Sequence, residues 1–97
     1  MRDAIPDTPT EWVYAVRQGN YIKIGLSRNV ANRLRELQTS SPEPLHLVGT
    51  FAGGRRLERL LHQRFADHRV RGEWFSLRIL PELLDMLAEE DTFRAAA

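Results

Sequence analysis

The sequence predicts an α+β fold in which a small, mostly antiparallel sheet of three strands is flanked by helices. Two segments near the N-terminus alternate apolar and polar residues with the period of two that is typical of strands. Three later segments repeat apolar residues at the spacing of a helix, and a third strand-like segment lies between the first two of them. Because 97 residues are enough for one domain with a small core, we expect these elements to pack together.

The first two strands are expected to form a hairpin from the segment WVYAVRQGNYIKIG, residues 12–25. A loop of two residues within QGN would place Tyr14, Tyr21 and Lys23 on one face, with Tyr14 directly or diagonally opposite Lys23. A loop of three residues would break this parity. The polar side chains are either the solvated face of a hairpin or half of an active site.

The remaining elements follow in order along the chain. A helix should begin at an N-cap of Ser27 or Asn29 and end in TSSPEP, before a strand over residues 45–51. A second helix is expected over residues 55–67, the segment EWFSL is an edge strand or a docked loop, and a third helix should begin near Pro81. The apolar positions expected to face the core are Val30, Leu34, Leu37, Leu57, Leu60, Leu61 and Phe65.

Composition narrows the class of protein. The chain has no cysteine, which excludes thiol catalysis, zinc–thiolate sites and disulfides. It has no long apolar run and no signal-peptide pattern, so we expect a cytoplasmic protein without a membrane partner. We assign residues 1–10 to a flexible leader, residues 11–91 to a single domain and residues 92–97 to a tail.

The net charge of +1 conceals a basic centre. Residues 13–78 carry twelve Lys and Arg against five acids, whereas the segments on either side are acidic. Eleven of the twelve cations are Arg, whose planar fork suits phosphate, so a polyanionic partner is one interpretation. The other interpretation is that the arginines only solubilise a small domain.

Several side chains could carry chemistry. Arg33 lies at the edge of the first helix's apolar stripe, where it either snorkels over the core or reaches into a cleft. Glu58 and His62 are four residues apart on the second helix and could share a metal ion, a water or a phosphate, or form an ordinary exposed pair. Glu73, in GEWF, is either a structural acceptor or a second acid at the site. His46 stands alone in its predicted strand.

These pieces, taken in order, resemble the GIY-YIG nuclease superfamily, most closely its T5orf172/MUG113-like branch. The similarity rests on VYAV, YIKIG-S, RLRELQT-SPEPL, GTF-GG, LERLLHQRF and GEWF, within residues 12–78. Tyr14 matches the tyrosine of GIY, and Trp12 replaces its glycine. Lys23 replaces the tyrosine of YIG, although Tyr21 on the same face could partly substitute for it.

The resemblance also assigns roles. Arg33 matches the superfamily's helix arginine and Glu58 its metal-binding glutamate, while His62 and Glu73 belong to the pattern of the branch. It implies a GIY-YIG-like fold and hydrolysis of DNA phosphodiester bonds with one Mg²⁺ or Mn²⁺ held by Glu58. In that scheme, Arg33 neutralises charge on the phosphoryl oxygens, Tyr14 orients or activates water, and Lys23 favours the phenolate or holds the phosphate. Contacts to duplex or branched DNA would come from Arg28, Arg35, Arg55, Arg56, Arg59, Arg64, Arg69 and Arg71.

Two other functions stay open at this point. The replacements at Trp12 and Lys23 are compatible with a non-catalytic nucleic-acid-binding module of the same fold. A protein-interaction domain is the third alternative. A chain this short offers little surface for reading a long sequence, so we expect weak specificity, a protein partner, or a homodimer formed through the acidic third helix.

Overall fold

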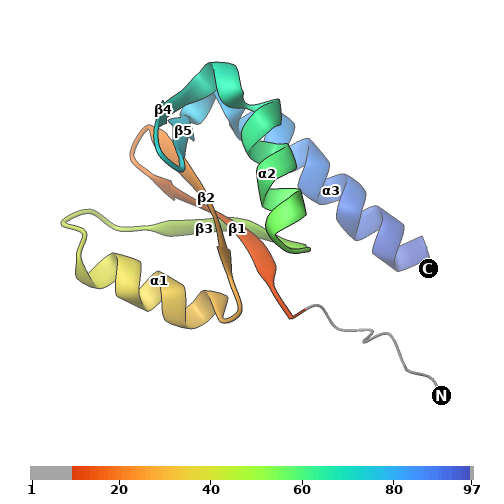
Figure 1. Ribbon diagram of the computed structural model, residues 1–97, viewed down its shortest axis with the longest axis horizontal. Coiled ribbons are helices and arrows are strands. Elements are labelled where there is room, and N and C mark those ends of the chain that lie inside the picture. The colour runs from red at the N-terminus through yellow and green to blue at the C-terminus, as the bar shows by residue number, and fades with distance from the viewer. Residues whose placement is uncertain (1–9, 97) are drawn as a thin grey trace.

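The computed structural model describes residues 10–96, which form one antiparallel sheet with three α-helices around it (Figure 1). The elements are β1 (Trp12–Gln18), β2 (Tyr21–Ser27), α1 (Val30–Thr39), β3 (His46–Ala52), α2 (Arg55–Arg64), β4 (Arg69–Arg71), β5 (Trp74–Ser76) and α3 (Leu80–Ala96), with short 3₁₀ turns before β4 and α3. The sheet order is β3-β1-β2-β5-β4. The predicted α+β class and antiparallel sheet are confirmed.

The predicted number of strands is wrong, because the described part of the chain has five rather than three. The two additional strands, β4 and β5, are three residues long, which is too short for an alternating pattern to be recognised. EWFSL therefore contributes an inner strand, and β4 forms the edge. The predicted leader covers residues 1–10, and residues 1–9 lie outside the part of the chain that the structure describes.

The hairpin between β1 and β2 has the predicted parity. Its loop is Gly19-Asn20, and Gly19 has a φ of 59°, a left-handed conformation that favours glycine. Tyr14 is paired with Gly25 and Val16 with Lys23, so Tyr14 and Lys23 are diagonal neighbours on one face.

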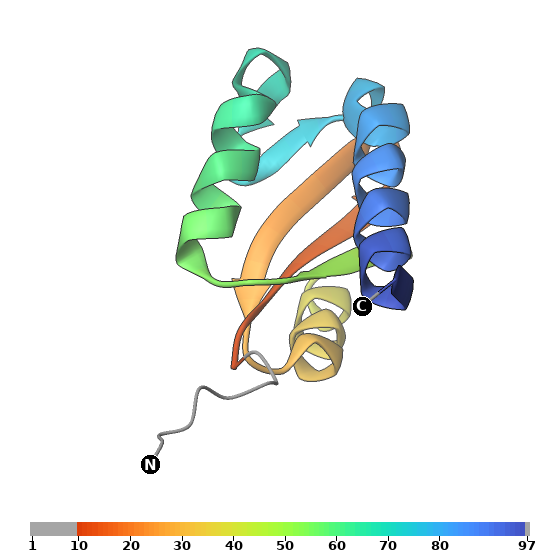
Figure 2. The same cartoon turned by 90° about the vertical axis from the view of Figure 1, so that its right-hand side faces the viewer.

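The two faces of the sheet are covered by different helices. Figure 2 shows α2 and α3 on one side of the sheet, while α1 lies on the other. The core lies on the side of α2 and α3 and consists of Val13, Ala15, Ile22, Ile24, Phe51, Leu61, Phe65, Phe75, Ile79 and Leu83. Within the described chain, α1 has no fully buried residue.

The helix boundaries differ slightly from those predicted. The N-cap of α1 is Asn29, whose Oδ1 accepts a 3.0 Å hydrogen bond from Asn32 N. The second helix ends at Arg64 and continues as a 3₁₀ turn, and Leu60, predicted to be buried, is 54% exposed. The third helix begins at Leu80 and ends at Ala96, beyond residue 91, the predicted end of the domain. No helix in the described part of the chain has both the length and the apolar character needed to cross a membrane.

The shortness of β5 leaves part of β2 without a neighbouring strand. β5 pairs with Tyr21, Ile22 and Lys23, and one further bond runs from Ile24 N to Glu73 O at 3.0 Å. Beyond that point the edge of β2 faces the N-terminal half of α2 (Figure 1). Side chains from α2 can therefore reach around this edge toward the face that carries Tyr14.

Candidate active site

A cleft of about 520 Å³ opens where β1, β2, α1 and α2 meet. It brings together five of the predicted site residues, from segments that are distant in the sequence: Tyr14, Lys23, Arg33, Glu58 and Glu73. The rest of its lining consists of Glu11, Leu26, Ser27, Arg28, Leu37 and Arg55. Charged groups of both signs thus line one cavity.

Tyr14 projects from β1 across the neighbouring strand. Its ring lies over Gly25, where an added Cβ would be only 2.5 Å from the phenol oxygen. The glycine of the KIG sequence therefore leaves space for the phenol. The residue is 2% exposed as a whole, yet its side chain lines the cleft.

The phenol of Tyr14 is held in its protonated form. Burial raises its pKa to about 12, and the negative charges of Glu73 and Glu58 act in the same direction. The guanidinium of Arg33 opposes this shift. At neutral pH the phenol is therefore a hydrogen-bond donor and acceptor rather than a phenolate.

Lys23 is engaged with Glu73 across the β2–β5 pair. Its Nζ donates to Glu73 Oε1 at 2.9 Å and lies 5.6 Å from the centre of the Trp74 ring. The Lys23 side chain is only 16% exposed, so the ion pair and the aromatic face compensate for much of its lost hydration. The structure thus directs the ammonium of Lys23 toward Glu73.

Glu58 and Glu73 form a pair of adjacent carboxyl groups. Burial raises the pKa of Glu58, and the neighbouring charge of Glu73 and a side-chain hydrogen bond between the two carboxyls raise it further. His62 and Arg55 oppose the shift. Glu73 therefore lies between a cation, Lys23, and a second acid, Glu58.

His62 lies behind this pair rather than among the residues that line the cleft. Its Nε2 is 2.9 Å from the carbonyl oxygen of Ile24, to which an Nε2–H would donate. Its ring meets Phe75 edge-on, with the ring centres 5.2 Å apart. His62 thus ties α2 to the open edge of β2, one turn of helix after Glu58, and its predicted catalytic role stays a prediction.

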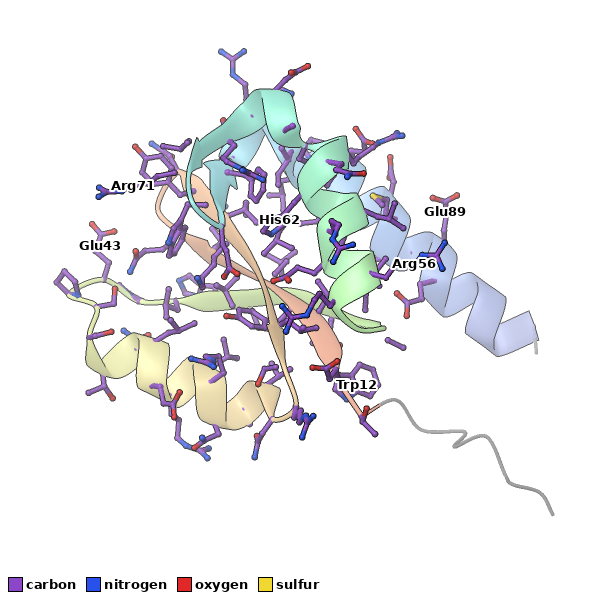
Figure 3. The ribbon with its side chains drawn as sticks, in the orientation of Figure 1. Trp12, Glu43, Arg56, His62, Arg71 and Glu89 are labelled. Carbon is purple, nitrogen blue, oxygen red and sulfur yellow. The ribbon has the colours of Figure 1, made fainter. Side chains whose placement is uncertain are left out.

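The arginines fall into two groups. Arg28, Arg33 and Arg55 line the cleft, and Arg33 is also 3.5 Å from Glu36 on the next turn of α1. The other six predicted phosphate-binding arginines lie outside the cleft lining and are exposed: Arg35, Arg56, Arg59, Arg64, Arg69 and Arg71. Figure 3 shows Arg56 on the side of α2 that faces α3. Tyr21 also lies outside the lining and is 48% exposed.

Two features of the site were not predicted. Glu11 adds a third carboxylate to the cleft lining, and its position directly before the first strand was the only available signal. The contact of Trp74 with Lys23 depends on the pairing of β5 with β2, which the short EWF segment did not reveal.

Glu58 and Glu73 are the groups best placed to hold a divalent cation. Within the part of the chain that the structure describes, no three His, Asp or Glu side chains gather closely enough to form a complete protein cage for a metal. Mg²⁺ does not require such a cage, because it keeps several waters and binds through one or two carboxylates. A pair of hard oxygen donors that repel each other fits that requirement.

Comparison with protein families identifies the chain. A family model described as the T5orf172 domain matches residues 11–90. The chain belongs to the T5orf172 domain family. No curated protein and no solved structure gave a match. All the cleft-lining residues, from Glu11 to Glu73, lie within the T5orf172 match.

Proposed function

We propose that this T5orf172 domain is a metal-dependent endonuclease of the GIY-YIG type that hydrolyses phosphodiester bonds in DNA. The observation that carries the proposal is the convergence of Tyr14, Lys23, Arg33 and Glu58 in one cleft from four different elements. Membership of the T5orf172 domain family is consistent with a nuclease or a DNA-binding module. The four positions themselves are the ones that the GIY-YIG resemblance of the sequence marks.

Mg²⁺ or Mn²⁺ would be held by Glu58, with Glu73 as the neighbouring acid. When bound, the ion supplies charge stabilisation at the scissile phosphate and at the leaving oxygen. Glu58 must be deprotonated to act as a ligand, and the nearby charges of His62 and Arg55 favour that form. Lys23 neutralises Glu73, which limits the repulsion between the two carboxylates.

The other cleft residues act on the phosphate and the attacking water. Arg33 reaches the cleft from α1 and neutralises charge that develops on the phosphoryl oxygens. The neutral phenol of Tyr14 orients the water by hydrogen bonding, since a group with a pKa of about 12 is a poor base at pH 7. Arg28 and Arg55 bind phosphates on either side of the scissile bond.

The alternative is a nucleic-acid-binding module without catalysis. The observation that favours it is the commitment of Lys23 to Glu73, which leaves Tyr14 without the cation expected to activate it. The two functions differ in one measurable property, because both bind DNA but only the endonuclease cleaves it.

Nicking of supercoiled plasmid DNA tests the proposal. The wild-type protein should convert supercoiled to open-circular plasmid in the presence of Mg²⁺ or Mn²⁺. This reaction should stop when EDTA is added. Glu58→Gln should lower the rate at least about 10³-fold, as expected when a group that stabilises the transition state is removed. Glu89→Gln is the matched control, because Glu89 is an exposed acid on α3 outside the cleft.

Two results would reject the endonuclease. One is activity that survives both EDTA and Glu58→Gln. The other is salt-dependent DNA binding with no nicking under any metal condition, which would support the non-catalytic module. Duplex, branched and single-stranded DNA and RNA, tested in parallel, would define the substrate.

A further inference from the structure

A second cavity adjoins the cleft at the start of β1. It has a volume of about 330 Å³ and is lined by Trp12, Arg28, Asn29, Val30 and Thr50. Arg28 lines both this cavity and the cleft that holds Tyr14, so the two are neighbours on either side of that residue. Figure 3 shows Trp12 at the beginning of β1, below the N-terminal end of α2.

The position of Trp12 relative to Tyr14 is set by the strand. The two residues are separated by one position, so both side chains lie on the same face of the sheet, about 6.6 Å apart along β1. A group bound against Trp12 would therefore be close to whatever Tyr14 contacts. This distance is short enough for one nucleotide to reach from the cleft to the cavity.

The walls of the cavity suit a flat aromatic ring. They offer the indole of Trp12, the apolar side chain of Val30 and the guanidinium of Arg28. Asn29 Oδ1 is already used to cap α1, accepting from Asn32 N at 3.0 Å. Stacking on Trp12 and cation–π contacts with Arg28 are therefore the main contacts that we expect for a base, and the Thr50 hydroxyl is one further polar group in the lining.

We propose that this cavity is a binding site for an unpaired nucleobase next to the scissile phosphate. The inference rests on the proposed nuclease function and adds a substrate class to it. Bases inside a duplex present only their edges, whereas stacking on an indole requires a base that is single-stranded, bulged or flipped out. The preferred substrate is thus nucleic acid with an unpaired nucleotide at the cleavage site, bound with little regard to base identity.

Binding of bulged duplexes in EDTA tests the base site separately from cleavage. The probes are a duplex with one bulged nucleotide and the same duplex with an abasic residue at the bulge, which carry equal numbers of phosphates. The wild type should bind the bulged base about tenfold more tightly than the abasic bulge, as expected for one stacked base. Trp12→Phe should keep most of this preference, and Trp12→Ala should abolish it.

The preference is a ratio within one protein, so a partly unfolded variant does not mimic the result. Equal binding of the two probes by the wild type would overturn the inference, as would an unchanged preference in Trp12→Ala. If Trp12→Ala lowers the unfolding temperature and wild type shows no preference, Trp12 only packs against its own chain. A base preference without nicking would reject the nuclease alone, whereas nicking without a base preference would reject the base site alone.

Discussion

The two faces of the sheet are built for different tasks. The face covered by α2 and α3 holds the apolar core, in which Ile22, Phe75 and Leu83 are each 0% exposed. The face toward α1 carries Trp12, Tyr14 and Lys23, and the helix that covers it has no fully buried residue in the described chain. The core face supplies most of the stability, and it thereby allows charged groups to be crowded together on the other face.

Replacing one leucine by alanine on each side of the sheet should give the largest difference, in the loss of free energy of unfolding. Leu83→Ala on α3 should lower the free energy of unfolding by about 3 kcal/mol, because it removes a fully buried side chain. Leu34→Ala on α1 should cost about 1 kcal/mol, since Leu34 is only half-buried. Urea denaturation measures both values. Equal losses would show that α1 contributes to the core as much as α3 does.

Alanine at two sheet glycines should separate activity from stability. A Cβ at Gly25 would meet the phenol oxygen of Tyr14 at 2.5 Å, so Gly25→Ala should displace Tyr14 and lower the nicking rate at least about tenfold. A Cβ at Gly49 would meet Leu87 Cδ1 at 2.7 Å on the opposite face. Gly49→Ala should therefore cost about 2 kcal/mol of stability and leave nicking by the folded protein unchanged. A reversed pattern would contradict the division between the faces.

The buried phenol should make stability depend on alkaline pH. The pKa of Tyr14 is about 12 in the folded protein and about 10 when unfolded, so its contribution is complete below pH 10 and is lost as pH rises toward 12. At pH 11 the wild type should have lost about 1.4 kcal/mol relative to Tyr14→Phe, compared with the same difference at pH 8. Urea melts at the two pH values measure this. No pH-dependent difference would mean that Tyr14 reaches solvent in the folded state.

Substitutions of two neighbouring arginines should give the smallest difference, a measurable one in DNA affinity and in its dependence on salt. Arg55 lines the cleft and Arg56 does not, although both are exposed in the first turn of α2. Arg55→Gln should lower the slope of log affinity against log salt by about one and weaken DNA binding severalfold. Arg56→Gln should change both the salt slope and the DNA affinity less than Arg55→Gln does. Identical slopes for the two variants would show that the phosphates of bound DNA do not lie along the cleft.

The local parts of the structure were predictable, whereas the links between distant segments were not. The parity of Tyr14 and Lys23 follows from strand alternation once the loop has two residues, and the residue types limited the N-cap of α1 to Ser27 or Asn29. The Lys23–Glu73 pair joins residues fifty positions apart through a strand of three residues. No periodicity specifies such a pairing. His62 was predicted to be a site residue, but its bond to Ile24 O depends on how far β5 extends.

The length of β5 controls access to the cleft. Because β5 begins only at Trp74, Ile24 O is left for His62, and the edge of β2 stays open to Glu58. If β5 were two residues longer at its N-terminal end, it would pair with this edge of β2. The side chains of α2 could then no longer reach the cleft. Lengthening or shortening the β4–β5 turn at Gly72 is therefore expected to change access to the cleft while the core stays intact.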